Sequence, residues 1–232
     1  GDSAIFYRYS ISGNSWAAMS PLPGAMSYGG SLVYPGSGNY IYAFRGNSTD
    51  FYRYSISGNS WIAMASAPGT VLRGAALVYP GSGDFMYAFQ GNSAVFWRYS
   101  ISANVWTAMS SAPADIYGGG SLAYPGSGDY IYASKGGNAN NIYSYSISGN
   151  SWTSMAAAPG GIVGGGSLAG AGIYLYAVRG GSGLNSYSQD FYRFTLAPYL
   201  ASGAHESQTL DMGAGTIPGY TALVFNPDLT AQ

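Results

Sequence analysis

Cysteine is absent from the 232-residue chain, which excludes disulfide bonds, thiolate zinc sites and cysteine nucleophiles. Histidine is almost absent as well, because the single one, His205, lies in the C-terminal tail. The residues before that tail therefore hold no Ser, His and Asp set, and no calcium loop of spaced acidic residues occurs. We predict no catalytic residues, no metal site and no cofactor.

Charge is also scarce, at 7% of residues against roughly 25% in ordinary soluble domains. The 8 basic and 9 acidic residues give a formal charge of -1, so the basic surface that nucleic-acid binding requires is missing. A surface of Ser, Asn, Gly, Thr and Tyr, with little charge to keep molecules apart, favours a tethered or assembled protein. We expect an extracellular or cell-surface location.

Long apolar runs are missing too. No stretch of about 18 apolar residues occurs, and the N-terminus lacks a basic segment followed by an apolar one. We expect neither a membrane span nor a signal peptide, and we interpret the sequence as a mature or excised piece.

Glycine (36 residues) and tyrosine (23 residues) are abundant, and they recur in a repeated phrase. The phrase FYRYSISGNSW ends at Trp61, and near-copies end at Trp16, Trp106 and Trp152, at intervals of 45, 45 and 46 residues. Repeats of this length are typical of propellers or solenoids.

Each repeat divides into four short apolar segments separated by turn residues. In the second repeat these segments are 73–79, 84–90, 95–101 and 106–109, and the turn PGSG occupies 80–83. Gly or Pro interrupts every candidate helix, so the pattern predicts an all-β chain. The first strand of each repeat is rich in Gly, Ala and Ser, which favours the crowded inner position of a radial array and places the tryptophan strand at the rim.

Several recurring positions carry a resemblance to a known family. The tyrosines that stand seven residues before the four tryptophans are Tyr9, Tyr54, Tyr99 and Tyr145. A glycine pair after the second strand is complete at 136–137 and 180–181 and is reduced to one glycine at Gly46 and Gly91. The prolines in the last part of the repeat are Pro23, Pro68, Pro113 and Pro159. These units resemble kelch repeats.

The resemblance covers about residues 4 to 196 and implies an all-β, kelch-like β-propeller of four-stranded antiparallel blades, about four of them from this chain. One departure is that serines replace the acidic residue that usually follows the kelch tyrosine; they are Ser10, Ser55, Ser100 and Ser146. Kelch propellers host unrelated activities, so the resemblance does not fix a function. Kelch-like copper oxidases use a cysteine-crosslinked tyrosine and histidine ligands, and this composition argues against that activity.

The ends of the chain leave the number of blades open. The chain begins with a third and a fourth strand (around 4–10 and 15–19) and closes with a first, second and third strand. Joining the ends would give four blades and one surplus third strand, so an excised arc, a small closed ring and a ring shared between chains all remain possible. We assign residues 1–196 to the propeller and 197–232 to a tail. That tail is either the start of a β-sandwich module or a strand-donating extension.

Two recurring sets of residues are interpreted as structural. The tryptophans and the methionines that follow them recur once per repeat, as packing residues would; the methionines are Met19, Met64, Met109 and Met155. The third-strand arginines are expected to pack their stems on aromatic rings and to hydrogen-bond to a neighbouring blade; they are Arg8, Arg53, Arg98 and Arg193.

The candidate ligand-binding residues lie where the second strand of each repeat ends. The residues that close the second strands are Arg45, Gln90, Lys135 and Arg179. Three of them are cations, and three cations near a common axis would form a positively charged mouth for carboxylates or acidic sugars. The plain alternative is that each cation pairs with a nearby Asp or with backbone carbonyls. The loops that follow vary in length and sequence, as binding loops on a rigid scaffold do. Their hydrogen-bonding and stacking residues are Asn47, Asn92, Asn138, Asn140, Asn141 and Tyr187.

These observations favour a non-enzymatic extracellular binding or adhesion module that recognises a protein or a glycan through loops at one end of the propeller. The alternative is a structural subunit of an extracellular filament or sheath, with possible self-association, assembled by exchange of strands or of the tail. A third hypothesis, a carbohydrate-active enzyme, would require two carboxylates such as Asp50 and Asp190 to meet in a cleft.

Overall fold

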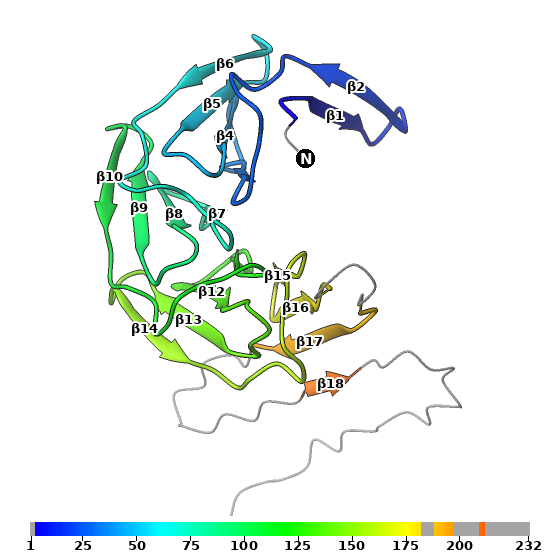
Figure 1. Ribbon diagram of the computed structural model, residues 1–232, viewed down its shortest axis with the longest axis vertical. Helices are drawn as coiled ribbons and strands as arrows, with labels where there is room; N and C mark the ends of the chain where they lie inside the picture. Colours follow the sequence, from blue (N-terminus) through cyan, green and yellow to red (C-terminus); the bar gives the residue numbers. More distant parts are fainter. Residues whose placement is uncertain (1–2, 182–187, 197–208, 212–232) are drawn as a thin grey trace, which may run out of the picture.

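The computed structural model describes residues 3–181, 188–196 and 209–211, and within these ranges every regular element is a β-strand. Figure 1 labels the strands in chain order. They are β1 (Phe6–Ser10), β2 (Ser15–Met19), β3 (Ser31–Val33), β4 (Tyr40–Phe44), β5 (Phe51–Ser55), β6 (Ser60–Ala63), β7 (Ala76–Val78), β8 (Phe85–Phe89), β9 (Phe96–Ser100), β10 (Val105–Ala108), β11 (Ser121–Ala123), β12 (Tyr130–Ser134), β13 (Ile142–Ser146), β14 (Ser151–Ser154), β15 (Ser167–Ala171), β16 (Tyr174–Val178), β17 (Phe191–Thr195) and β18 (Thr209–Asp211). The predicted all-β class is confirmed.

The strands form four antiparallel sheets of four strands each, arranged as the blades of a propeller (Figure 1). We name them blade 1 (β3–β6), blade 2 (β7–β10), blade 3 (β11–β14) and blade 4 (β15–β18), and we call β1–β2 the N-terminal hairpin. The first strands of successive blades contact one another, so these short, small-residue strands are the inner ones, as the sequence predicts. The predicted segments of the second repeat correspond to β7, β8, β9 and β10 with slightly narrower bounds.

Turns set the register of each blade. The turn between the third and fourth strands places an asparagine in the left-handed region, which asparagine tolerates better than other residues with a side chain. These asparagines are Asn14, Asn59, Asn104 and Asn150. In each turn a serine hydroxyl accepts a hydrogen bond from a backbone N–H three residues further on, as Ser55 does from Gly58 at 3.1 Å. The serines that follow the repeated tyrosines therefore hold the turn.

Three of these asparagines, Asn59, Asn104 and Asn150, also join their blade to the unit before it. Asn104 Oδ1 accepts the Tyr99 hydroxyl at 2.7 Å and the backbone N–H of Ala65, in blade 1, at 2.9 Å. Trp106 Nε1 donates to the carbonyl of that same Ala65 at 2.9 Å. One backbone unit of the preceding blade is thus held at both its N–H and its C=O, in an arrangement that we call the clamp. The clamp recurs at Ser20, held by Asn59 and Trp61, and at Ser110, held by Asn150 and Trp152.

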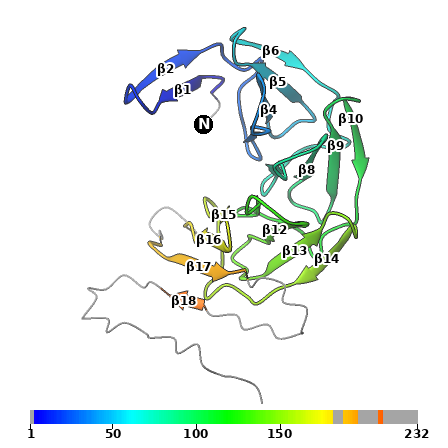
Figure 2. The same cartoon turned by 180° about the vertical axis from the view of Figure 1, so that it is seen from behind.

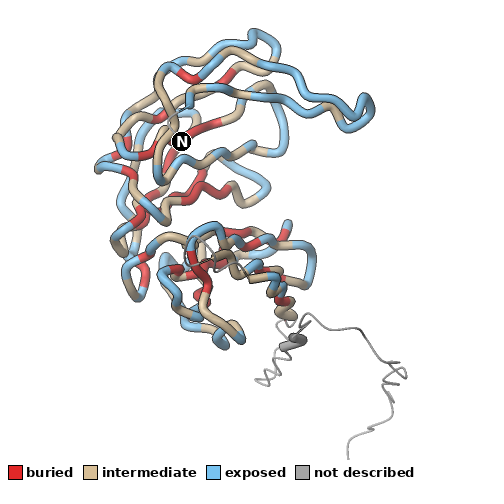
Figure 3. Tube along the Cα trace, turned by 45° about the vertical axis from the view of Figure 1, so that its right-hand side comes forward, coloured by how far each residue is buried: buried red, intermediate tan, exposed pale blue. Residues whose placement is uncertain are grey.

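Aromatic rings fill the space between blades. Phe51 of blade 1 meets Tyr99 and Trp106 of blade 2 edge-on, each with ring centroids 4.9 Å apart. Phe96 of blade 2 meets Tyr145 and Trp152 of blade 3 in the same way, at 4.8 and 5.0 Å. The predicted packing role of the tryptophans is therefore confirmed. The hydrophobic core is divided into layers between successive blades, and its buried residues appear as red segments in Figure 3.

The recurring arginines behave in part as predicted. Arg53 and Arg98 lay their guanidinium groups over the rings of Tyr40 and Phe85, at 4.0 and 4.1 Å from the ring centroids. These rings belong to the second strand of the same blade. The Nε atoms of Arg53 and Arg98 are buried and make no hydrogen bond, so the hydrogen bond expected to a neighbouring blade is not seen at those atoms.

Within the described residues, the N-terminal hairpin and blade 4 are not joined to each other. β1 pairs with β2 alone among the described strands, and β15–β16–β17 carry β18 of the tail as their outer strand. The hairpin and blade 4 stand at opposite ends of an arc, as the reverse view in Figure 2 also shows. The described residues thus form an arc of four blades and a two-stranded hairpin and not a small closed ring, while an excised arc and a ring shared between chains both stay predictions. The rest of the tail lies outside the described residues, and the assignment of residues 197–232 stays a prediction.

We predict that Asn104→Gly lowers the free energy of unfolding by about 1–3 kcal/mol, since it removes the acceptor of two hydrogen bonds and leaves the fully buried Tyr99 hydroxyl without a partner. Glycine keeps the left-handed backbone, so the turn itself is preserved. The matched control is Asn14→Gly, in the hairpin, where no blade precedes and the Tyr9 hydroxyl is open to water. Chemical denaturation that gave equal losses for the two variants would contradict a stabilising role for the clamp.

Candidate binding site at the loop end of the propeller

Two kinds of loop gather at one end of the propeller axis, which we call the loop end. They are the loop between the second and third strands of each blade and the loop that leads into the next first strand. Backbone hydrogen bonds tie them together across blades. The Asn47 N–H is shared between the carbonyls of Tyr28, in its own blade, and Val71, in the next, at 3.0 and 2.7 Å, and the Asn138 N–H donates to the carbonyl of Ile162, in the next blade, at 2.9 Å. This end is therefore built on a fixed backbone frame.

Two of the predicted cations are neutralised by carboxylates. Arg45 Nη1 lies 2.7 Å from Asp50 Oδ2, and Arg45 Nε donates to the Ala25 carbonyl at 3.0 Å. The hydrogen bond to Asp50 raises the pKa of Arg45 above its ordinary value. At the equivalent place in blade 4, Arg179 Nη1 lies 3.0 Å from Asp190 Oδ2. The plain alternative, that these cations pair with a nearby Asp and with carbonyls, describes both of them.

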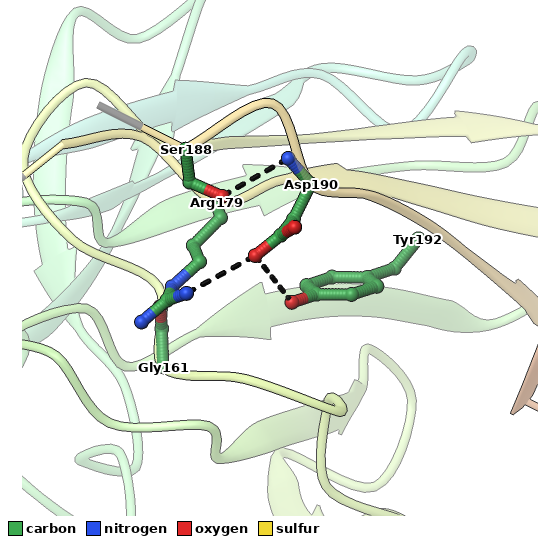
Figure 4. Close-up of polar contacts among 5 residues, drawn as sticks. All are labelled: Gly161, Arg179, Ser188, Asp190 and Tyr192. Carbon is green, nitrogen blue, oxygen red and sulfur yellow. Dashed lines mark hydrogen bonds and ion pairs between the residues drawn. The ribbon is translucent and has the colours of Figure 1, made fainter. Parts of the chain in front are cut away.

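Figure 4 shows the surroundings of Asp190 in blade 4. Its backbone N–H donates to Ser188 Oγ at 3.0 Å, and its Oδ2 accepts the Tyr192 hydroxyl at 3.2 Å. Arg179 Nε donates to the Gly161 carbonyl at 3.1 Å, which ties the loop after β16 to the loop before β15. Hydrogen bonding by Ser188 and then by Arg179 lowers the pKa of Asp190 below its ordinary value.

The other two members of the predicted set have no carboxylate partner. Gln90 Nε2 donates to the Thr70 carbonyl at 3.1 Å, and its Oε1 accepts the Ser93 hydroxyl at 3.1 Å, so an amide performs the bridging that the arginines perform in blades 1 and 4. No ion pair involves the half-buried Lys135 within the part of the chain that the structure describes. Binding of a ligand by these four residues stays a prediction.

A depression of about 930 Å³ opens at the loop end and spans blades 2, 3 and 4. Its lining consists of loop residues from all three blades; they are Arg73, Asn92, Tyr117, Gly118, Gly137, Asn138, Val163, Gly164 and Gly181. The lining thus includes two of the candidate residues, Asn92 and Asn138, each in the left-handed backbone conformation, and their binding of a ligand stays a prediction. The lining does not include the predicted residues at the ends of the second strands, which are Arg45, Gln90, Lys135 and Arg179.

The depression combines one cation, two amides, one aromatic ring and glycine backbone. The Arg73 guanidinium lies over the Tyr28 ring, 3.9 Å from its centroid, which fixes the orientation of the cation. The Tyr117 ring is 40% exposed, and its hydroxyl donates to Asp115 at a long 3.4 Å. Such a surface offers stacking and hydrogen bonds together with a single positive charge, since no carboxylate lines it.

Sequence reasoning missed Arg73 and Tyr117. The signal is variation at the two positions that precede the glycines before each inner strand. These positions hold Ser27 and Tyr28 in the first blade, Leu72 and Arg73 in the second, and Tyr117 and Gly118 in the third. These residues read as the start of a small-residue strand, although the inner strands begin only three to four residues later. Asn47 acts through its backbone, and Tyr187 lies outside the described residues.

The structure offers no carboxylate pair at the two positions considered for glycoside cleavage. Asp50 is held by Arg45 in blade 1, and Asp190 is held by Arg179 in blade 4. Within the described ranges no group of three or more His, Cys, Asp or Glu side chains is placed to bind a metal ion. None of the described residues forms a helix with the length and apolarity needed to cross a membrane.

Comparison with known proteins supports the fold only. No protein-family model matches the chain, and no curated protein matches it. Among solved structures, one named "Structure of YjhT" is similar, with a TM-score of 0.62 and 13% sequence identity. The similarity covers 76% of this chain and 66% of that one, so this chain spans slightly less than two thirds of the length of the protein it matches. At this identity the similarity shows a shared fold and carries no function across.

We predict that Asp190→Asn lowers the thermal midpoint at neutral pH and that its deficit relative to the wild type disappears in acid. The folded pKa of Asp190 lies below its ordinary value of 3.8, so its stabilising effect is present above that value and is lost as the pH falls through the folded pKa. Gln90→Ala, at the uncharged equivalent of Arg179, is the control. Its deficit should not change with pH. A deficit of Asp190→Asn that stayed constant down to pH 2 would refute the assignment.

Proposed function

We propose that the chain is a kelch-like binding module of an exported or cell-surface protein, and that it recognises a glycan or a polar protein segment at the loop end without catalysing a reaction. The observation that carries this proposal is the depression across blades 2, 3 and 4. It is lined by variable residues on a rigid, repeated frame, which is the usual arrangement of a binding surface. Kelch membership rests on the repeated residues of the sequence, and the surface location rests on the low charge.

The chemistry of the lining favours a neutral, polyhydroxylated ligand such as a sugar. Tyr117 presents an exposed ring on which the apolar face of a sugar can stack, and the amides of Asn92 and Asn138 can both donate and accept hydrogen bonds. Arg73 adds one cation, enough for a single carboxylate. The paired state of Arg45 and Arg179 argues against a strongly acidic ligand.

A non-enzymatic role is favoured by how the two candidate carboxylates are used. Glycoside cleavage needs two carboxyl groups within about 10 Å of each other across the scissile bond. Asp50 and Asp190 instead each neutralise an arginine of their own blade, which ties each of them to a structural contact. The fold alone does not decide the matter, because propellers host both enzymes and binding proteins.

The experiment is a glycan and surface-protein array probed with the wild type and with Tyr117→Ala and Arg73→Ala. We expect a ligand for the wild type and a loss of affinity of about tenfold or more for each variant, as is usual when a central aromatic or arginine contact is removed. The matched control is Tyr34→Ala, which removes a similarly exposed tyrosine from the turn between β3 and β4, at the opposite end of blade 1. Equal binding by all four proteins would place the ligand elsewhere.

The second candidate function, a subunit of an extracellular filament or sheath assembled by strand or tail exchange, is favoured by a different observation. The inner edge of β1 is unpaired among the described strands and could accept a strand from another chain. Deletion of residues 197–232 discriminates the two functions. An assembly whose mass by light scattering is unchanged by the deletion would exclude exchange of the tail.

A further inference from the structure

The contacts between blades 1 and 2 and between blades 2 and 3 are built from the same residue types. The preceding blade supplies a ring from the end of its second strand and a phenylalanine from the start of its third, and the following blade supplies a tyrosine and a tryptophan. Phe44 and Phe51 thus meet Tyr99 and Trp106, with Phe44 and Trp106 stacked at 5.5 Å. Phe89 and Phe96 repeat this with Tyr145 and Trp152. We call the two halves the phenylalanine face and the tryptophan face.

The N-terminal hairpin has a tryptophan face that nothing in the described chain covers. Tyr9 and Trp16 occupy the positions of Tyr99 and Trp106, yet Tyr9 is 41% exposed and Trp16 is 69% exposed, whereas Tyr99 is fully buried. The hairpin is accordingly pale blue over most of its length in Figure 3. On its other side the hairpin is docked, because Phe6 packs against Tyr54 and Trp61 of blade 1.

Blade 4 has the complementary face, also uncovered. Val178 and Phe191 occupy the positions of Phe44 and Phe51 and are 42% and 41% exposed, against 0% and 1% for their counterparts. Tyr176 and Phe191 are nevertheless stacked at 5.6 Å and 15°. Tyr42 and Phe51 in blade 1 have almost the same arrangement, at 5.8 Å and 20°. The phenylalanine face of blade 4 is therefore already shaped for a partner.

We propose that the two free faces bind each other between molecules, so that blade 4 of one copy packs against the N-terminal hairpin of a second copy, head to tail. Both halves of an interface that the chain uses between its own blades are exposed on one molecule, at opposite ends of the arc (Figure 1). A second copy presents the matching half, and the low charge of the chain gives little repulsion to oppose contact. This association is independent of any ligand at the loop end.

Such an interface is heterologous, since two different surfaces meet. Head-to-tail contacts leave one free face of each kind on every dimer, so assembly continues until the rotation between copies closes a ring, or proceeds as an open filament. The contact needs neither the tail nor an exchanged strand, which separates it from assembly by strand or tail exchange.

The first test measures self-association by sedimentation velocity over a range of protein concentrations. We expect the wild type to sediment as species larger than a monomer, and Trp16→Ser and Phe191→Ser each to sediment as monomers, because each lacks one face. Their mixture should form a dimer and nothing larger, since one intact face of each kind remains. Val105→Ser removes an equally exposed apolar residue from the outer strand of blade 2 and should associate like the wild type. A wild type that stays monomeric at every soluble concentration overturns the proposal.

A second test uses the absence of cysteine in the native chain and does not depend on the serine variants. Trp16→Cys and Phe191→Cys proteins mixed under oxidising conditions should form the mixed disulfide dimer faster than either forms its own. The double variant should give intermolecular disulfides. A double variant that instead closes a disulfide within one molecule shows that the two faces meet in the same chain, which also overturns the proposal.

Discussion

The structure depends on one contact, in which blades 1, 2 and 3 each hold a single backbone unit of the hairpin or blade before them. An asparagine oxygen accepts the N–H of that unit and an indole N–H donates to its carbonyl, as Asn104 and Trp106 do to Ala65. This contact explains why the phrase repeats: the tyrosine orients the asparagine, the serine and the left-handed asparagine form the turn, and the tryptophan covers the rings of the preceding blade. Each residue type recurs once in blades 1, 2 and 3, because each of these blades makes the contact once.

The clamp also determines the form of the loop end. Because it fixes each blade relative to its neighbour at the rim, the loops at the other end of the strands can approach closely, and glycine becomes necessary there. A Cβ atom on Gly119 would collide with the backbone of Val163 in the next blade, and its φ of 91° is strained for any other residue. Glycine is thus required beside the depression, while Arg73 and Tyr117 contribute side chains to its lining.

Most of the fold could be predicted from the sequence, because its signals are local: a tryptophan interval, a tyrosine seven residues before it, and turn residues between short apolar segments. The pairing of the cations could also have been found. One loop position is equivalent in all four blades, because its backbone carbonyl accepts the N–H of the residue that closes the second strand; it holds Asp50, Val95, Asn141 and Asp190. The residue that closes the second strand is an arginine in the two blades where this loop position holds Asp. The depression could not be predicted, because it depends on which loops of three different blades meet.

The ends of the arc follow from the same nearest-neighbour principle. In a repeat array the stability is approximately a sum over repeats and the contacts between them, so a terminal unit has one contact where an internal unit has two. Blades 2 and 3 are covered on both faces, whereas the hairpin relies on Phe6 and two strands, and blade 4 has its stacked Tyr176 and Phe191 open to solvent. The residue types that fill the contacts between internal blades are therefore the ones left exposed at the two ends. Because the two free faces correspond to opposite halves of one interface, the association that we propose joins unlike ends of the arc and not like ends.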